Sequence, residues 1–134
     1  MSWGTADKAG SGQRAGGRGL VERLLERAAH LEPEDRRLVE QVLDAGESLR
    51  NLAARHRVPP RNLQRRYRNT LRRLASPEFI FIARFADRLP PRHRRAAQLI
   101  YLRGFSQRRT ADAAGLSLHE VRQAVRAVQT LARL

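Results

Sequence analysis

Residues 106–126 decide the fold of this chain, and they read SQRRTADAAGLSLHEVRQAVR. Ser106 is placed to cap a short helix that ends before Gly115, because serine is a preferred N-cap and glycine commonly ends a helix. Ser117 and Glu120 then form a capping box that opens a second helix. Because only a few residues join the two helices, they must cross steeply, as in a helix-turn-helix.

The residues between and beyond these caps meet the steric demands of such a crossing. Ala111 leaves room where the helices meet, Gly115 has no Cβ at the turn, and Leu116 follows with an apolar side chain. The second helix presents one apolar face at helical spacing, made of Val121, Val125, Val128 and Ala132. Each position has its own steric reason, so the pattern predicts a helix-turn-helix over 106–134.

The sequence repeats itself from residue 20 onward with an offset of 58 residues and no gap. The matched pairs include Leu31 and Leu89, Pro33 and Pro91, Gly46 and Gly104, Ser48 and Ser106, and Arg68 and Arg126. The helix starts and stops therefore repeat in phase. They predict helices over 20–30, 33–44, 48–56 and 60–75, and again over 76–88, 90–103, 106–114 and from 117. Since no strand pattern appears, we expect an all-α fold of two tandem four-helix units, each ending in a helix-turn-helix, packed together.

Three segments organise the chain. Residues 1–19 hold six glycines and few large apolar groups, which predicts a disordered Gly-rich tail or a minor-groove arm carrying Arg14 and Arg18. Residues 20–75 form the first helix-turn-helix unit and residues 76–134 the second. The helix over 76–88 offers many apolar side chains to a core, namely Phe79, Phe81, Ile82, Ala83, Phe85 and Ala86. That is too apolar for a linker, so we expect this helix to bury against the first unit.

The charge balance points to an anionic partner. The 134 residues contain 27 Lys and Arg against 13 Asp and Glu, a formal net charge of +14, and nucleic acid is the commonest large polyanion. Cysteine is absent, which excludes disulfides, thiol catalysis and cysteine-ligated zinc. The four histidines lie on different predicted helices without metal-ligand spacing, so we expect no metal, no cofactor and no enzyme. No apolar run approaches the ~20 residues of a membrane span, and we expect a cytoplasmic protein.

The second unit carries a motif spread over several of its helices. Its residues are Leu89-Pro-Pro-Arg, Tyr101-Leu-Arg-Gly104-Phe-Ser106, Ala111, Gly115-Leu-Ser117 and Val121-Arg-Gln123. This motif resembles region 4 of bacterial sigma factors, over 89–134 and more weakly over 31–75. The resemblance implies a helix-turn-helix that reads promoter DNA and docks on RNA polymerase. It implies DNA-facing residues at His119, Arg122, Gln123 and Arg126, with Arg108 and Arg109 near the phosphate backbone.

Physical chemistry supports the same interpretation of the helix that begins after Ser117. Side chains near the start of a recognition helix, on the face away from the core, reach base edges. Glutamine can pair bidentately with adenine, and arginine with guanine. The alternative is a solvated helix face with no ligand.

The first unit departs from this pattern at its turn and in its charge. Arg57 stands where the turn glycine is expected, and left-handed backbone costs a bulky residue about 1 kcal/mol, so we expect a differently built turn. Residues 57–75 contain seven arginines and no acid. The phosphate contacts predicted there are Arg61, Arg65, Arg66, Arg68 and Arg72. A plain charged surface helix is the alternative.

Acidic residues collect on the preceding helix. They are Glu32, Glu34, Asp35, Glu40, Asp44 and Glu47. Glu34 and Asp35 stabilise a helix N-terminus through its dipole, which explains them structurally. The alternative is a docking face for a basic protein, for example an element of RNA polymerase.

These observations predict a double-stranded DNA-binding transcription regulator that acts with RNA polymerase. We do not expect a complete sigma factor, because no segment remains to melt the promoter. One alternative is a phage Q-type antitermination factor bound to RNA polymerase, and another is a phage small terminase subunit, which would assemble as a ring. RNA binding stays open, because arginine-rich helices also bind RNA. The sequence leaves the oligomeric state undetermined.

Overall fold

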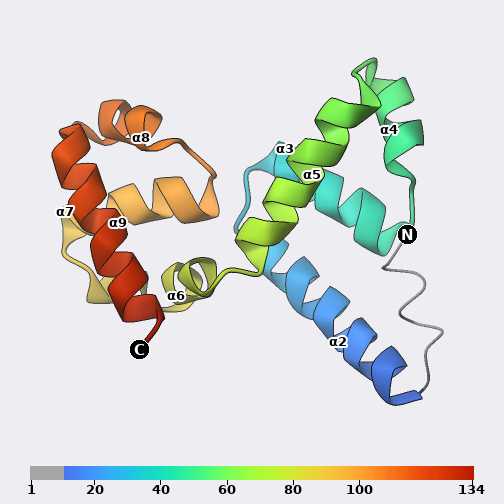
Figure 1. Cartoon of the computed structure of the whole chain (residues 1–134), viewed down its shortest axis with the longest axis horizontal. Coiled ribbons are helices and arrows are strands. Elements are labelled where there is room, and N and C mark those ends of the chain that lie inside the picture. Colours follow the sequence, from blue (N-terminus) through green and yellow to red (C-terminus); the bar gives the residue numbers. More distant parts are fainter. Residues whose placement is uncertain (1–10) are drawn as a thin grey trace.

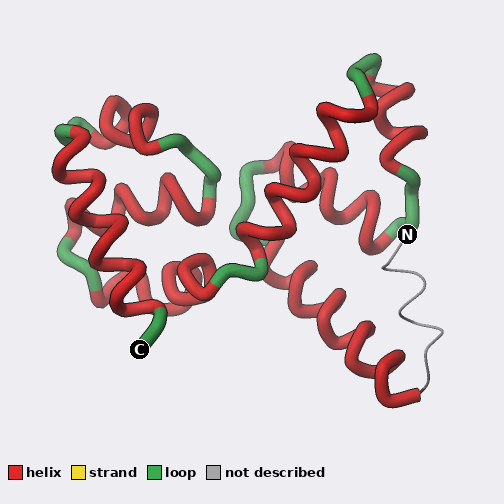
Figure 2. The backbone as a smooth tube through the Cα atoms, viewed as in Figure 1, coloured by secondary structure: helices red, strands yellow, loops and turns green. Residues whose placement is uncertain are grey.

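The computed structural model describes the backbone of residues 11–134 and the side chains from residue 19 onward. Every regular element in that range is a helix (Figure 1, Figure 2), and no residue of the range lies in a β-strand. The predicted all-α class is therefore confirmed.

The elements of the two halves of the chain follow one order. The N-terminal half contains α2 (Ser11–Ala28), α3 (Pro33–Val39), the π-helical segment η1 (Glu40–Asp44), α4 (Leu49–His56) and α5 (Pro60–Leu74). The C-terminal half contains α6 (Pro77–Phe85), the 3₁₀ segment η2 (Ala86–Arg88), α7 (Pro91–Ala97), the π-helical segment η3 (Gln98–Leu102), α8 (Gln107–Ala114) and α9 (Leu118–Ala132). Each element from α3 to α5 has a counterpart of equal length that begins 58 residues later.

The helix α2 begins at Ser11 rather than at residue 20, so residues 11–19 of the expected tail are helical. Leu24 and Ala28 of α2 are buried, and a helix anchored in this way extends at little cost, because each added residue gains a hydrogen bond. The rest of the expected tail, residues 1–10, and the side chains of the expected minor-groove arm lie outside the described residues.

Serine side chains cap the helices where the sequence predicts them. Ser76, Ser106 and Ser117 each accept a hydrogen bond from a backbone N–H three residues later. The capping box is reciprocal, because the Glu120 carboxylate accepts from the Ser117 N–H at 3.0 Å while the Ser117 hydroxyl accepts from the Glu120 N–H at 3.1 Å. The hydrogen bond from the Ser117 backbone N–H to the Glu120 carboxylate is the main cause of the lowered pKa of Glu120. Ser48 caps α4 in the same way.

Gly46 and Gly104 end the two π-helical segments with the same geometry. Both have positive φ, at 72° and 76°, which glycine adopts without steric cost. At each site the next residue donates a backbone hydrogen bond six residues back, from Glu47 to Gln41 and from Phe105 to Leu99, both at 2.9 Å. This bond reaches one residue further back than the hydrogen bond of a Schellman motif, because π-helical turns precede each glycine, and it satisfies a carbonyl group at the helix end.

The turn between α4 and α5 is built like the turn between α8 and α9, which corrects our expectation. Arg57 has φ 56° and ψ 44°, and Gly115 has φ 66° and ψ 36°. Leu52 and Leu63, on the two helices that Arg57 joins, are buried in one core. Burial of such side chains contributes more than the roughly 1 kcal/mol that the left-handed arginine costs, so packing imposes the conformation.

Replacing Arg57 by glycine is expected to raise the free energy of unfolding by about 1 kcal/mol, because glycine adopts this backbone without the Cβ clash. The matched control is Arg57→Ala, which removes the same charge and keeps the left-handed penalty. Thermal unfolding of both variants checks this. Equal gains in Tm would mean that charge, not backbone strain, is responsible.

The helix α6 joins the two halves and contributes to both cores (Figure 1). Phe79 is fully buried in a cluster formed with Leu24, Ala28, Leu31, Val39 and Leu74 of the N-terminal half. Phe81 and Ile82 pack instead in the cluster that contains Leu89, Ala97 and Val128. Phe85, expected in the core, is 36% exposed, because it is the last residue of α6; its ring lies near Phe81 and under the Arg88 guanidinium.

Candidate nucleic-acid interface

The helices α8 and α9 are joined by three residues, Gly115, Leu116 and Ser117. Thr110 and Ala111 are the buried residues of α8, and Val121, Ala124 and Val128 are those of α9. The Leu116 N–H donates to the Ala111 carbonyl at 3.0 Å, which closes the turn over the crossing. Ala111, Gly115 and Leu116 therefore occupy the positions in the turn that the sequence predicts for them.

The outer face of α9 brings together the residues predicted to face DNA. His119, Arg122, Gln123 and Arg126 are all exposed. Arg122, Gln123 and Arg126 follow His119 by three, four and seven residues. This helical spacing places all four on one side of α9, opposite its buried residues. Neither arginine pairs with a carboxylate of the residues whose side chains are described. This face begins within the first turn of α9 and has free guanidinium and amide groups.

Arg108 and Arg109 lie on α8, where both are exposed. The Arg109 guanidinium carbon lies 3.8 Å from the centroid of the Phe105 ring, a cation–π contact that orients the side chain. Arg108 has no ion-pair partner within the described part of the chain. The two arginines therefore differ in how firmly they are positioned.

The arginines of α5 separate into two groups. Arg61, Arg65, Arg68 and Arg72 are exposed, and their spacing of four, seven and eleven residues from the first places them on one face. Arg66 lies apart from this face, because it pairs with Asp35 at 2.8 Å and Glu34 at 3.3 Å on α3. The structure thus gives Arg66, one of the predicted phosphate contacts, carboxylate partners within the chain.

The exposed faces of α5 and α9 correspond residue by residue at the offset of 58. Arg61, Gln64, Arg65, Arg68 and Arg72 match His119, Arg122, Gln123, Arg126 and Thr130 in that order. Gln64 is exposed and was not among the predicted site residues. The repeat itself was the signal that could have identified it, because it aligns Gln64 with Arg122.

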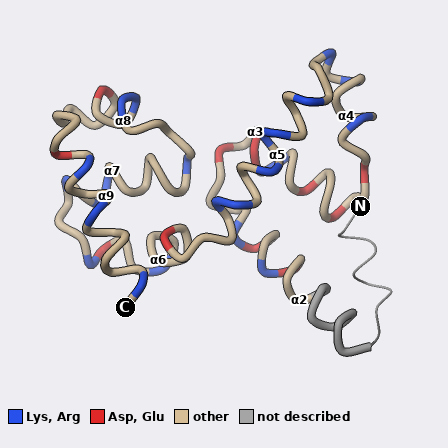
Figure 3. The backbone as a smooth tube through the Cα atoms, viewed as in Figure 1, with Lys and Arg blue, Asp and Glu red and all other residues tan. Residues whose placement is uncertain are grey.

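Five of the six residues of the acidic cluster pair with arginines of the same chain, and Asp44 is the exception. Figure 3 shows acidic positions on α3 beside basic positions of α5. Glu32 pairs with Arg103 at 3.2 Å, Glu40 with Arg36 at 3.1 Å, and Glu47 with Arg55. These contacts support the structural interpretation of the acidic cluster over a docking face.

Arg73 lies at the junction of the two halves. It is mostly buried, 3.5 Å from the Asp35 carboxylate, and a Cβ at Gly104 would collide with its guanidinium group. Burial lowers the pKa of Arg73, and the nearby Asp35 opposes this effect. Arg73 thus has a structural position rather than a place on the exposed face of α5.

The described residues contain no group of three or more His, Asp or Glu side chains that could hold a metal ion. Within the same residues, no helix has both the length and the apolar character needed to cross a membrane. Comparison of the chain with protein-family models, with curated proteins and with solved structures gave no match.

Proposed function

We propose that this protein is a double-stranded DNA-binding transcription regulator, made of two tandem four-helix units that each end in a helix-turn-helix. The observation that carries the proposal is the exposed face of α9, where His119, Arg122, Gln123 and Arg126 gather beside the N-terminus of a capped helix. A helix that follows such a turn places this part of its surface in the major groove. The net charge of +14 favours a polyanionic partner.

The two helix-turn-helix elements would make different kinds of contact with DNA. Gln123 and Arg122 have the functional groups that read adenine and guanine edges. Arg61, Arg65, Arg68 and Arg72 form a face with more positive charge, which suits phosphate contacts. In this proposal α9 supplies sequence preference and α5 supplies most of the sequence-independent affinity.

The placement of α5 and α9 is compatible with a single duplex. In Figure 1, α5 passes in front of α3 and α9 passes in front of α7, so both helices lie on one side of the molecule. Their C-terminal ends approach α6, and their N-terminal ends diverge (Figure 1). Neighbouring segments of one duplex could therefore meet both helices.

Sequence preference is expected to depend on Gln123. Gln123→Ala should lose about 1–3 kcal/mol of discrimination at one base pair and change binding to random duplexes little. Arg65→Ala should do the reverse, lowering affinity for all duplexes without altering preference. Selection of binding sites from random duplexes by the wild type and both variants measures this. An unchanged preference in Gln123→Ala would show that α9 is not the reader.

Action with RNA polymerase is part of the proposal, and its support is the resemblance to sigma region 4. Co-purification of core RNA polymerase with the tagged chain, in cytoplasmic extract of a bacterial host, tests it. Binding at a promoter would indicate a regulator, and binding at a pause region would indicate a Q-type antitermination factor. A large discrete oligomer that binds DNA without polymerase would indicate a small terminase subunit instead. Preference for RNA over duplex DNA would contradict the proposal.

A further inference from the structure

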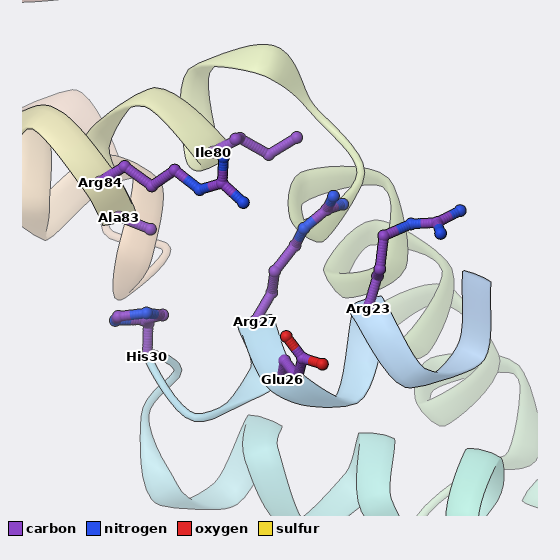
Figure 4. Close-up of a pocket in the computed structure, with 7 residues that line it drawn as sticks. All are labelled: Arg23, Glu26, Arg27, His30, Ile80, Ala83 and Arg84. Atoms are coloured by element: carbon purple, nitrogen blue, oxygen red, sulfur yellow. The ribbon is translucent and has the colours of Figure 1, made fainter. Parts of the chain in front are cut away.

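A pocket between α2 and α6 gathers positive charge at a distance from both helix-turn-helix turns. Its volume is about 210 Å³. Its polar lining consists of Arg23, Glu26, Arg27, His30 and Arg84 (Figure 4). In Figure 1, α2 and α6 lie in the lower half of the molecule, whereas both turns lie in its upper half. This pocket is separate from the proposed DNA-reading faces.

The pocket holds more cations than its own acid can balance. Arg23 and Arg27 are four residues apart on α2, a spacing at which like charges destabilise a helix. Arg84 extends from α6 toward Arg27 (Figure 4). None of the three arginines pairs with a carboxylate among residues 19–134, and Glu26 is the acid in the lining. Burial, followed by repulsion from Arg23 and Arg84, lowers the pKa of Arg27. A bound anion would relieve this repulsion.

Two of the side chains that line the pocket are held in place by the N-terminal core. The Arg27 Nη1 donates to the Leu74 carbonyl oxygen at 3.2 Å. The rings of His30 and Phe79 form a T-shaped contact, with centroids 6.2 Å apart. Such anchoring lowers the entropy lost on binding, because fewer side chains must be ordered by the ligand.

We propose that this pocket binds a phosphate group. The planar guanidinium of arginine matches the oxygens of phosphate and forms paired charge-assisted hydrogen bonds with them. The volume is below the roughly 300–1,000 Å³ of sites for drug-sized ligands, so the pocket suits the phosphate group rather than a whole large ligand. The phosphate could belong to a small ligand or to the backbone of a nucleic acid that extends around the protein.

Isothermal titration of the full chain with inorganic phosphate, at constant ionic strength set with sodium chloride, tests the proposal. Wild type is expected to bind, and Arg84→Gln is expected to weaken the affinity about tenfold or more, because a charge-assisted hydrogen bond is lost. Arg95→Gln is the matched control, since Arg95 is exposed on α7 and outside the pocket. Equal affinities in all three proteins, or no binding by wild type, would overturn the proposal.

Thermal unfolding at low ionic strength gives a second measurement. Without phosphate, Arg84→Gln should raise Tm relative to Arg95→Gln, because it removes repulsion from Arg27. With phosphate, wild type should gain more Tm than Arg84→Gln, because the ligand binds the folded state. A lower Tm of Arg84→Gln without phosphate would contradict the repulsive cluster on which the proposal rests.

The salt dependence of duplex binding separates the two sources of phosphate. If the pocket receives a nucleic-acid phosphate, Arg84→Gln should flatten the slope of log K against log[salt] by about 1. If it receives a small ligand, the slope should stay unchanged in Arg84→Gln while the affinity for inorganic phosphate falls about tenfold or more. Because phosphate titration needs no DNA, its result is independent of the proposed DNA binding.

Discussion

Phe79→Ala is expected to lower the free energy of unfolding by about 3–5 kcal/mol, since it removes a buried aromatic ring and leaves a cavity. Phe79 is 0% exposed and lies in the cluster with Leu24, Val39 and Leu74, although it belongs to α6. The loss should therefore affect the junction of the two halves as well as the N-terminal core. Urea unfolding monitored by circular dichroism measures it.

Phe85→Ala is the matched control for this substitution, because it removes the same ring from the same helix. Phe85 is 36% exposed, so the expected loss is about 1 kcal/mol or less. Wild type should unfold in one transition, since α6 contributes to both cores, and limited proteolysis should spare residues 76–90. Equal losses in the two variants, or early cleavage in 76–90, would show that Phe79 does not join the halves.

The double variant Arg65→Ala, Arg72→Ala is expected to lower affinity for every duplex about a hundredfold at moderate salt, because each arginine makes a charge-assisted contact with phosphate. Wild-type log K should fall with log[salt] at a slope of about −5 to −7, if roughly six to eight arginines contact phosphates. The double variant should flatten that slope by about 2. Fluorescence anisotropy with a labelled duplex over a range of salt concentrations measures both quantities.

Arg37→Ala with Arg95→Ala provides the control for charge. Both arginines are exposed, on α3 and α7, and neither has an ion-pair partner in the described structure. Alanine keeps the helix propensity in each case. The control removes the same net charge from positions outside the basic face of α5. If α5 contacts the phosphates, this control should leave the slope nearly unchanged. Equal flattening in both double variants would indicate a diffuse charge effect and no contact through α5.

Most helix boundaries were predictable because the groups that set them lie close together along the chain. Ser117 and Glu120 exchange hydrogen bonds across three residues, and Gly104 ends its helix through its own positive φ. The predicted helix over 60–75 corresponds to α5 at Pro60–Leu74. Helical periodicity likewise placed the exposed residues of α9, because burial alternates with the turn of the helix. These features depend on neighbours within one or two turns.

The turn between α4 and α5 and the start of α2 were not predictable from such local signals. A propensity argument disfavours Arg57 in left-handed backbone, yet packing of Leu52 and Leu63 outweighs that cost. Glycine content favoured disorder before residue 20, yet α2 continues back to Ser11. In both places interactions with the rest of the fold, or with an existing helix, overcame an unfavourable preference of about 1 kcal/mol for each arginine or glycine concerned.

The sequence by itself determined the helical class, the repeated order of elements and the exposed face of α9, since these follow from periodicity and local capping. Only the tertiary structure decided which arginines are available. Arg66 and Asp35 are 31 residues apart and pair because α5 packs against α3, which removes Arg66 from the basic face. Arg27 and Arg84 come together because α2 and α6 line one pocket. Charge pairing between distant residues depends on how helices cross, and a local pattern does not contain that information.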